Sequence, residues 1–218
     1  MNVRYFLPLA ALCLAWSAGA NAERGVGWDF GADLIYQDSQ DIDFKGGSFA
    51  SLDDDLGIAL SFGYRFNSRL ELTFGLDWST VDYNVNVAPG QAGLLGFSAN
   101  GDLEAFTPRV GLNFNFLEGD VTPYVSAGVG WAFIDTNIPN GPPQTGCYWD
   151  PWFGYICSTW QSTRSIDELT YQAGAGIRWD ISSGYTLRFG YEKRWIDLGE
   201  ATSTPGFDLV KLGVTFRY

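Results

Sequence analysis

Apolar and polar residues alternate along most of this chain. From Leu56 to Phe66 the even-numbered positions are large and apolar, whereas the odd-numbered positions are mostly small, and Leu70 to Trp78 repeat the pattern. Alternation with a period of two residues is typical of a β-strand whose two faces meet different surroundings. The pattern predicts eight strands, over residues 26–36, 55–66, 69–83, 103–116, 121–134, 167–181, 185–196 and 207–218.

The predicted strands are about ten residues or longer, whereas strands of soluble proteins usually have five or six. Such a length suits a tilted strand that crosses a membrane. The links alternate between short turns, at 67–68, 117–120 and 182–184, and long polar loops, at 37–54, 84–102, 135–166 and 197–206. This alternation predicts an all-β fold, an eight-stranded antiparallel up-and-down transmembrane β-barrel with its long loops at one end.

The two faces of the predicted strands differ in bulk. One face carries large aromatic rings, whereas the opposite face is rich in glycine, for example Gly57, Gly63, Gly75, Gly174 and Gly190. A soluble eight-stranded barrel with an apolar interior is the alternative, but eight strands enclose only enough space for packed side chains and cannot hold all these rings. The rings are therefore expected to face lipid, with interfacial girdles near the strand ends formed by Trp28, Tyr36, Trp78, Trp131, Trp179, Tyr185, Trp195 and Tyr218.

Charges of both signs fall on the predicted inner face. The acids are Asp29, Asp33, Glu71, Asp77, Glu168, Asp180 and Glu192, and the bases are Arg65, Arg69, Arg109, Arg178, Arg188, Arg194, Lys211 and Arg217. Because buried charges need partners, this nearly balanced set predicts a lumenal network of ion pairs. The network either plugs the barrel or lines a narrow path for small solutes, and the small bore favours the plug.

The first residues have the order of a secretory signal peptide. Arg4 precedes an apolar run over residues 5–16, and small residues follow up to Ala20-Asn21-Ala22. We expect cleavage after Ala22, which leaves residues 23–218 as one barrel domain. Cys13 is removed with this segment, and the remaining pair, Cys147 and Cys157, suits a disulfide in an oxidising compartment.

The third long loop has the most distinctive composition. Cys147 and Cys157 enclose nine residues, of which five are aromatic: Tyr148, Trp149, Trp152, Phe153 and Tyr155. Closing so short a loop stabilises the folded protein by roughly 2–3 kcal/mol, because the cross-link restricts the unfolded chain. The rings form either an exposed contact surface for a glycan, a protein or a phage, or a self-packed cluster that caps the barrel mouth.

Two smaller features each have two interpretations. Pro108 lies within a predicted strand and cannot donate a ladder hydrogen bond, so it indicates either a lateral gap for an apolar ligand or simply a bulge or missing bond. Asp53, Asp54 and Asp55 either attract divalent cations or are only solvated.

Composition excludes several functions. The chain has no histidine, which removes His-dependent triads, dyads and His-ligated zinc. No motif groups the remaining carboxylates and hydroxyls, so neither catalysis nor a cofactor or metal site is expected. The formal net charge of −12 argues against a nucleic-acid partner.

The last strand ends at the end of the chain, where Val210, Leu212, Val214, Phe216 and Tyr218 alternate. With the signal peptide and the eight strands, this terminus resembles the small outer-membrane β-barrel superfamily of OmpA-, OmpX- and OmpW-like proteins. The resemblance implies a place in the outer membrane of a Gram-negative bacterium, in contact with membrane lipid and lipopolysaccharide, and we expect the barrel to be a monomer. It also implies periplasmic termini, extracellular long loops and recognition of residues 207–218 by the barrel assembly machinery.

Members of that superfamily include structural anchors, adhesins, small channels and lipid A enzymes. The enzymes rely on histidine, so their activities do not transfer to this chain. The sequence therefore predicts an integral outer-membrane protein with a structural or surface-recognition role through its external loops. The alternative is a narrow, porin-like channel for small solutes or apolar compounds.

Overall fold

The structure is a computed structural model that describes residues 25–88, 97–139, 144–160, 163–199 and 201–218. The predicted signal peptide, residues 1–22, lies outside this part of the chain. No helix within the described residues is both long and apolar enough to cross a membrane.

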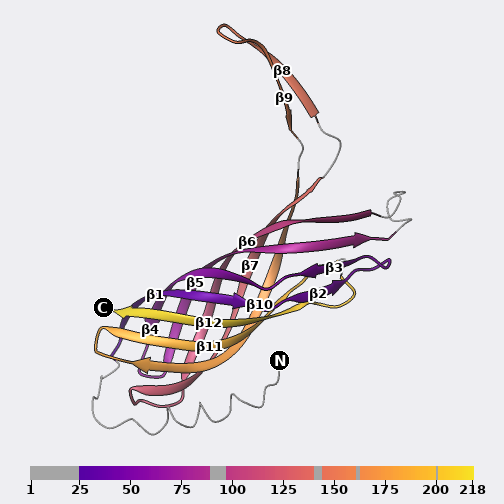
Figure 1. Cartoon of the computed structure of the whole chain (residues 1–218). Helices are drawn as coiled ribbons and strands as arrows, with labels where there is room; N and C mark the ends of the chain where they lie inside the picture. Colours follow the sequence, from indigo (N-terminus) through magenta and orange to yellow (C-terminus); the bar gives the residue numbers. More distant parts are fainter. Residues whose placement is uncertain (1–24, 89–96, 140–143, 161–162, 200) are drawn as a thin grey trace.

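Eight antiparallel strands form a closed barrel, as predicted (Figure 1). Each of these strands pairs with the next around the barrel, and β1 pairs with β12 to close it. In order around the barrel, the strands are β1 (Gly27–Gln37), β4 (Asp55–Arg65), β5 (Leu70–Val87), β6 (Phe97–Asn115), β7 (Val121–Pro139), β10 (Thr163–Asp180), β11 (Tyr185–Ile196) and β12 (Gly206–Arg217).

Four barrel strands are longer than predicted, because β5, β6, β7 and β10 continue into segments that were expected to be loops. In β5 the two faces exchange character at this level: Asp82 and Asn84 are exposed opposite Asp102 and Asn100, whereas Val81, Tyr83 and Val85 pack inward. The outer face is therefore polar there, so the row of large apolar outward residues that predicts the barrel strands ends, although backbone pairing continues.

The long loops also contain strands that the sequence pattern did not predict. The first loop holds β2 (Gln40–Asp43) and β3 (Phe49–Leu52), and β3 pairs with the extended part of β5. The third loop holds β8 (Gln144–Asp150) and β9 (Gly154–Trp160), which among the described strands pair with each other alone. These strands are short, and β8 and β9 carry apolar residues on both faces, so no clean alternation marks them.

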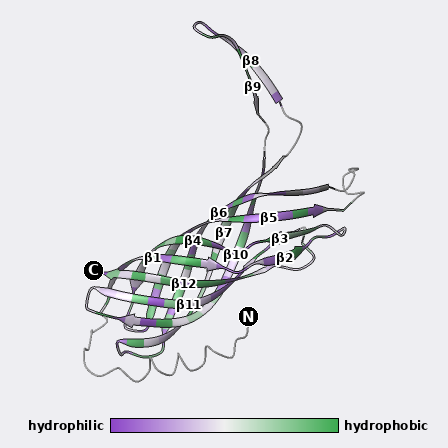
Figure 2. Ribbon diagram, in the orientation of Figure 1, coloured by the Kyte–Doolittle hydropathy of each residue, from purple (hydrophilic) through white to green (hydrophobic). Residues whose placement is uncertain are grey.

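The outer surface of the barrel is an apolar band that ends in aromatic rings. Hydrophobic and hydrophilic residues alternate along the barrel strands (Figure 2). At the end with the short turns, hereafter the short-turn end, Trp28 packs against Tyr64 with ring centroids 4.9 Å apart. At the opposite, long-loop end, Trp78 packs on Phe106 at 5.2 Å. Such rings at both ends of an apolar band are typical of membrane-spanning barrels.

Glycines on the inner face leave room for large lumenal side chains. The Tyr124 side chain, which points inward from β7, lies over Gly176 and Gly190 on the neighbouring strands. A Cβ atom on Gly190 would lie 2.5 Å from the Tyr124 hydroxyl. The small residues that the sequence places on the inner face therefore leave space, and a few large lumenal side chains occupy it.

The lumen at the long-loop end is apolar, in contrast to the charged interior that the sequence predicts. Buried residues from the barrel wall, including Ile35, Val81 and Leu209, pack with Ile42 of β2 and Leu52 of β3. Hydrogen bonds join the first and fourth loops above this layer, as where the Thr202 amide donates to the Asp43 carbonyl at 2.9 Å. The first and fourth loops are therefore joined to each other and pack against this apolar layer.

A bulky residue at Gly176 should destabilise the barrel, because a Cβ atom there would lie 2.7 Å from the Gly190 Cα atom and 2.8 Å from Tyr124. We expect Gly176→Leu to lower the free energy of unfolding by about 1–3 kcal/mol or more. Ala175→Leu is the matched control, since Ala175 is the neighbouring residue and is exposed on the lipid-facing side. Urea titration of the refolded protein in detergent measures both, and equal stability of the two variants would contradict this packing.

Candidate functional site

The half of the lumen nearer the short-turn end holds a group of ion pairs around Arg178, hereafter the lower charged group. This guanidinium on β10 is 1% exposed and lies 3.0 Å from the Glu71 carboxylate on β5 and 3.1 Å from Asp180. Arg188 lies 2.7 Å from the other oxygen of Glu71. Arg178 thus connects opposite walls of the barrel through groups that are almost completely out of solvent.

The same group extends to the short-turn end. Arg65 on β4 lies 3.1 Å from Asp29 on β1, and Arg217 on β12 pairs with Asp180. Thr186 donates a hydrogen bond to Asp180 at 2.8 Å and accepts one from the Arg217 Nε atom at 3.0 Å. These contacts join β1, β4, β10, β11 and β12 just inside the short turns.

A second group of charges, hereafter the upper charged group, lies nearer the middle of the barrel, around Asp77 on β5. Arg109 lies 2.9 Å from Asp77, Arg194 pairs with it, and Lys211 is 3.6 Å away. Lys211 also lies 2.7 Å from Glu192, and Arg194 lies 3.3 Å from the same carboxylate. Two carboxylates thus hold three cations at this level of the lumen.

Three predicted lumenal residues have different surroundings. Asp33 lies between the two groups and interacts electrostatically with Arg188, Lys211 and Arg109. Glu168 lies on the inner side of β10 opposite Ala132, level with the apolar layer, and no ion pair within the described residues joins it to either group. Arg69 does not face the lumen: its side chain is 52% exposed and lies 3.1 Å from Glu118 at the short-turn rim.

The lumen is thus occupied at successive levels, by two charged groups and then by the apolar layer. The charged side chains of both groups are nearly all less than about one-eighth exposed. The apolar layer beyond them includes Tyr83 and Phe207, both buried. This arrangement suits structural filling of the bore better than passage of solutes.

Pro108 interrupts one ladder of the barrel without forming a bulge. Backbone pairing between β6 and β7 is present up to Phe106–Phe133 and resumes at Arg109–Gly130 in the same register. On its other side Pro108 remains opposite Leu76 of β5. A ladder hydrogen bond is therefore absent at Pro108, as one interpretation expects. The unchanged register excludes a bulge and shows that the two strands do not slide relative to each other.

The acidic residues at the long-loop end do not converge on a cation site. Within the described part of the chain, no three metal-ligating side chains are grouped suitably. Asp54 instead accepts a hydrogen bond from the Tyr36 hydroxyl at 3.0 Å. The pKa of Asp82 is raised, because its carboxyl group hydrogen-bonds to Asp102 and because nearby carboxylates repel its negative charge. These contacts mark an acidic surface around the long-loop end.

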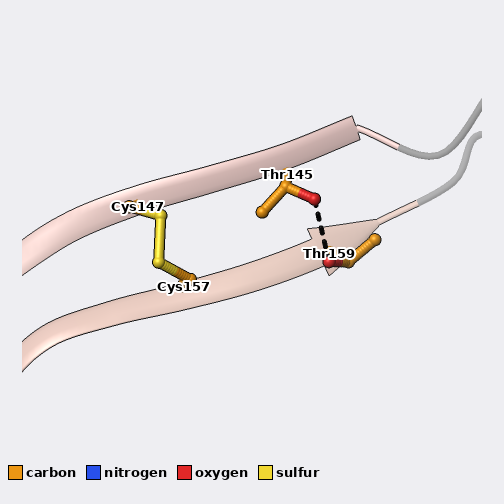
Figure 3. Close-up of a disulfide and its surroundings, with 4 residues drawn as sticks. All are labelled: Thr145, Cys147, Cys157 and Thr159. Carbon is orange, nitrogen blue, oxygen red and sulfur yellow. Dashed lines mark hydrogen bonds between the residues drawn. A yellow bond between two sulfur atoms is a disulfide. The ribbon is translucent and has the colours of Figure 1, made fainter.

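The β8–β9 hairpin is closed by the predicted disulfide between Cys147 and Cys157, which lie directly opposite each other (Figure 3). On the same face, the hydroxyls of Thr145 and Thr159 are hydrogen-bonded at 3.0 Å (Figure 3). In the turn, Asp150 accepts hydrogen bonds from the Trp152 and Phe153 amides at 2.8 and 2.9 Å. The hairpin therefore has a cross-link, a polar pair and a capped turn of its own.

The five predicted contact residues all lie at the outer end of this hairpin and are exposed. Trp152 and Phe153 in the turn are 86% and 82% exposed, and Tyr148, Trp149 and Tyr155 flank them. The hairpin extends away from the barrel beyond the long-loop end (Figure 1). In this structure the aromatic loop therefore does not lie over the barrel mouth (Figure 1).

Neutralising the central carboxylate should destabilise the barrel strongly. Asp77→Asn would leave Arg109, Arg194 and Lys211 close together with one fewer negative charge, and breaking a buried pair costs about 3–5 kcal/mol. The control is Glu118→Gln, because the exposed Arg69–Glu118 pair should contribute less than about 1 kcal/mol. Urea unfolding measures both variants, and a fully stable Asp77→Asn protein would show that the cations do not depend on this carboxylate.

Comparison with known proteins agrees with this architecture. The fold is similar to that of the outer membrane protein OprG from Pseudomonas aeruginosa, with a TM-score of 0.58, 14% identity, and coverage of 91% of this chain and 99% of that chain. It is also similar to Neisserial surface protein A, with a TM-score of 0.53, 16% identity, and coverage of 89% and 100%. No curated protein matches the sequence. A family model described as an outer membrane protein beta-barrel domain matches residues 6–218, so this chain belongs to the family of outer-membrane β-barrel proteins.

Proposed function

We propose that this outer-membrane protein makes contacts at the cell surface, with a filled barrel that anchors the β8–β9 hairpin outside the cell. The observation that carries the proposal is the exposure of five aromatic rings on a cross-linked hairpin that stands away from the barrel (Figure 1). Exposed apolar patches of this kind usually mark sites of contact.

The orientation in the membrane is part of the proposal. The amide of Trp28 and the carbonyl of Tyr218 are hydrogen-bonded, so both ends of the described barrel lie at the short-turn end. Short turns face the periplasm in outer-membrane barrels, whereas long loops face outside. We therefore place the termini in the periplasm, where the assembly machinery would recognise β12, and the hairpin outside, above lipopolysaccharide.

The filled lumen supports anchoring over transport. Arg178 links opposite walls within the lower charged group, and Asp77 holds three cations in the upper group. A solute would have to separate these ion pairs and then pass the apolar layer that includes Tyr83 and Phe207. A channel for small solutes or apolar compounds remains the second candidate, and the conductance measurement below decides whether ions pass.

The composition of the hairpin limits what it can contact. Residues 144–160 contain no lysine or arginine, and Asp150 is their one charged residue. A polyanionic ligand would find no positive partner here, whereas aromatic rings can stack on sugar rings or pack against apolar surfaces. The contact is therefore expected to depend on the rings rather than on charge.

A refolded protein in a planar bilayer should show no discrete conductance steps. The same result is expected after the Cys147–Cys157 disulfide is reduced, because the hairpin does not cover the barrel mouth (Figure 1). Asp77→Asn with Glu192→Gln is a useful comparison, since loss of both carboxylates should loosen the upper charged group. Reproducible steps in the unaltered protein would favour the channel instead.

Cells of a non-adherent Gram-negative host that display the protein should adhere to at least one of three surfaces. These surfaces are an immobilised glycan panel, immobilised extracellular proteins and supported phosphatidylcholine bilayers. The double variant Trp152→Ala/Phe153→Ala should abolish most of the adherence, because both rings are exposed in the turn. Phe49→Ala is the matched control, an exposed aromatic of β3 outside the hairpin. Unchanged adherence of the double variant, or none by the unaltered protein, would refute the contact function.

A further inference from the structure

The outer end of the hairpin is apolar on every side. Trp149 and Tyr155 form a cross-strand pair on one face, with ring centroids 5.2 Å apart. Tyr148 lies opposite Ile156, and because successive residues alternate, this pair belongs to the other face. With Trp152 and Phe153 in the turn, the apolar surface encloses the end of the ribbon, hereafter the aromatic tip, defined as Tyr148, Trp149, Trp152, Phe153, Tyr155 and Ile156.

A surface that surrounds the ribbon differs from an ordinary one-sided interface. A protein or glycan docked on the Trp149–Tyr155 face would leave Tyr148 and the turn rings in water. A medium that accepts the tip from all sides would cover every ring at once. The interfacial region of a lipid bilayer is such a medium, and tryptophan and tyrosine are enriched there.

We propose that the aromatic tip inserts into the interfacial region of an apposed phospholipid bilayer, which brings the outer membrane close to a second membrane. This inference rests on the proposed contact function of the hairpin and names the chemistry of its partner. The strand part of the tip, from Tyr148 to Asp150, is about 7 Å long at the rise of an extended chain, and the turn lies beyond it. This length matches the roughly 5–10 Å to which interfacial segments bury their apolar side chains.

The polar groups of the hairpin fit an interfacial depth. Asp150 accepts hydrogen bonds from the Trp152 and Phe153 amides, so two turn N–H groups are satisfied within the protein. The outer edges of β8 and β9 pair with no other described strand, and lipid chains cannot satisfy such edges. The tip therefore stays among hydrated headgroups, and the Thr145–Thr159 pair behind the disulfide remains in water.

Charge selects the kind of bilayer. The full chain has a formal net charge of −12, and the hairpin offers no cation of its own. Anionic headgroups, including those of lipopolysaccharide, would repel the acidic long-loop end that contains Asp82 and Asp102. A zwitterionic phospholipid surface carries no such penalty, so the proposed partner is a zwitterionic bilayer.

The disulfide keeps the tip ready for insertion. An isolated two-stranded hairpin is only marginally stable in water, and Cys147 and Cys157 lie immediately behind the Tyr148–Ile156 pair. Cross-linking there limits the conformations of the free loop, so fewer are lost when the rings enter the bilayer.

The test uses two vesicle populations. The full-length mature protein is reconstituted in phosphatidylcholine vesicles, and acceptor vesicles contain brominated phosphatidylcholine, which quenches tryptophan fluorescence on contact. Barrel tryptophans stay in the donor membrane, so quenching by the acceptor reports the hairpin, in which Trp149 and Trp152 lie in the tip and Trp160 ends β9. We expect quenching together with vesicle clustering measured by light scattering, and weaker quenching by brominated phosphatidylglycerol acceptors.

Phe153→Asp is the diagnostic variant, because it retains both reporter tryptophans and places a charge in the tip. It should weaken clustering at least about tenfold. Phe49→Asp, at an exposed aromatic position of β3 outside the hairpin, should cluster vesicles as the unaltered protein does. Heat-modifiable electrophoretic mobility checks that both variants are folded. A double Cys147→Ser/Cys157→Ser variant should also cluster vesicles less well.

The outcomes separate this inference from the contact function. Hairpin-dependent adherence to glycans or proteins without acceptor quenching would overturn the bilayer as the partner and leave the contact function standing. Equal quenching by anionic and zwitterionic acceptors would overturn the selection by charge. Quenching only by bromolipid in the donor membrane would show that the hairpin lies on its own membrane, which also overturns the proposal.

Discussion

The narrow interior of an eight-stranded barrel is the constraint on which the rest of this structure depends. Because the outer face must be apolar to meet lipid, charged residues within the wall have only the lumen to occupy. There each charge needs a partner within reach, as Arg178 finds Glu71 across the bore and Asp180 on its own strand. Glycines opposite the large lumenal side chains are the other half of this solution.

The barrel could be predicted from the sequence because its two faces differ so strongly. Lipid on one side and a crowded lumen on the other impose the same alternation on every strand, so strand number, pairing and the positions of most lumenal charges follow from periodicity. Where that contrast ends, prediction fails. Toward their extensions, β5 and β6 become polar on the outer face, and the aromatic end of β8 and β9 is apolar on both faces.

Two features of the lumen were missed for different reasons. The apolar layer had a readable signal, since Phe207 and Leu209 alternate with outward residues of β12 and therefore had to face inward. Arg69 was placed inward by parity, yet it lies at the first turn, where Asn67 accepts hydrogen bonds from the amides of residues 69 and 70. Alternation along a strand does not fix the direction of a side chain in the turn before it. The exposed Arg69–Glu118 pair was therefore not predictable from alternation.

The packing of Tyr124 over Gly176 and Gly190 has a consequence for how such proteins diverge. A lipid-facing position needs only an apolar side chain, so it can drift one substitution at a time. The three lumenal positions are linked, because a larger residue at either glycine requires a smaller one at the tyrosine. Change inside the barrel therefore proceeds by paired replacements, and descendants of one ancestor can keep the same wall while filling it with different sets of matched side chains.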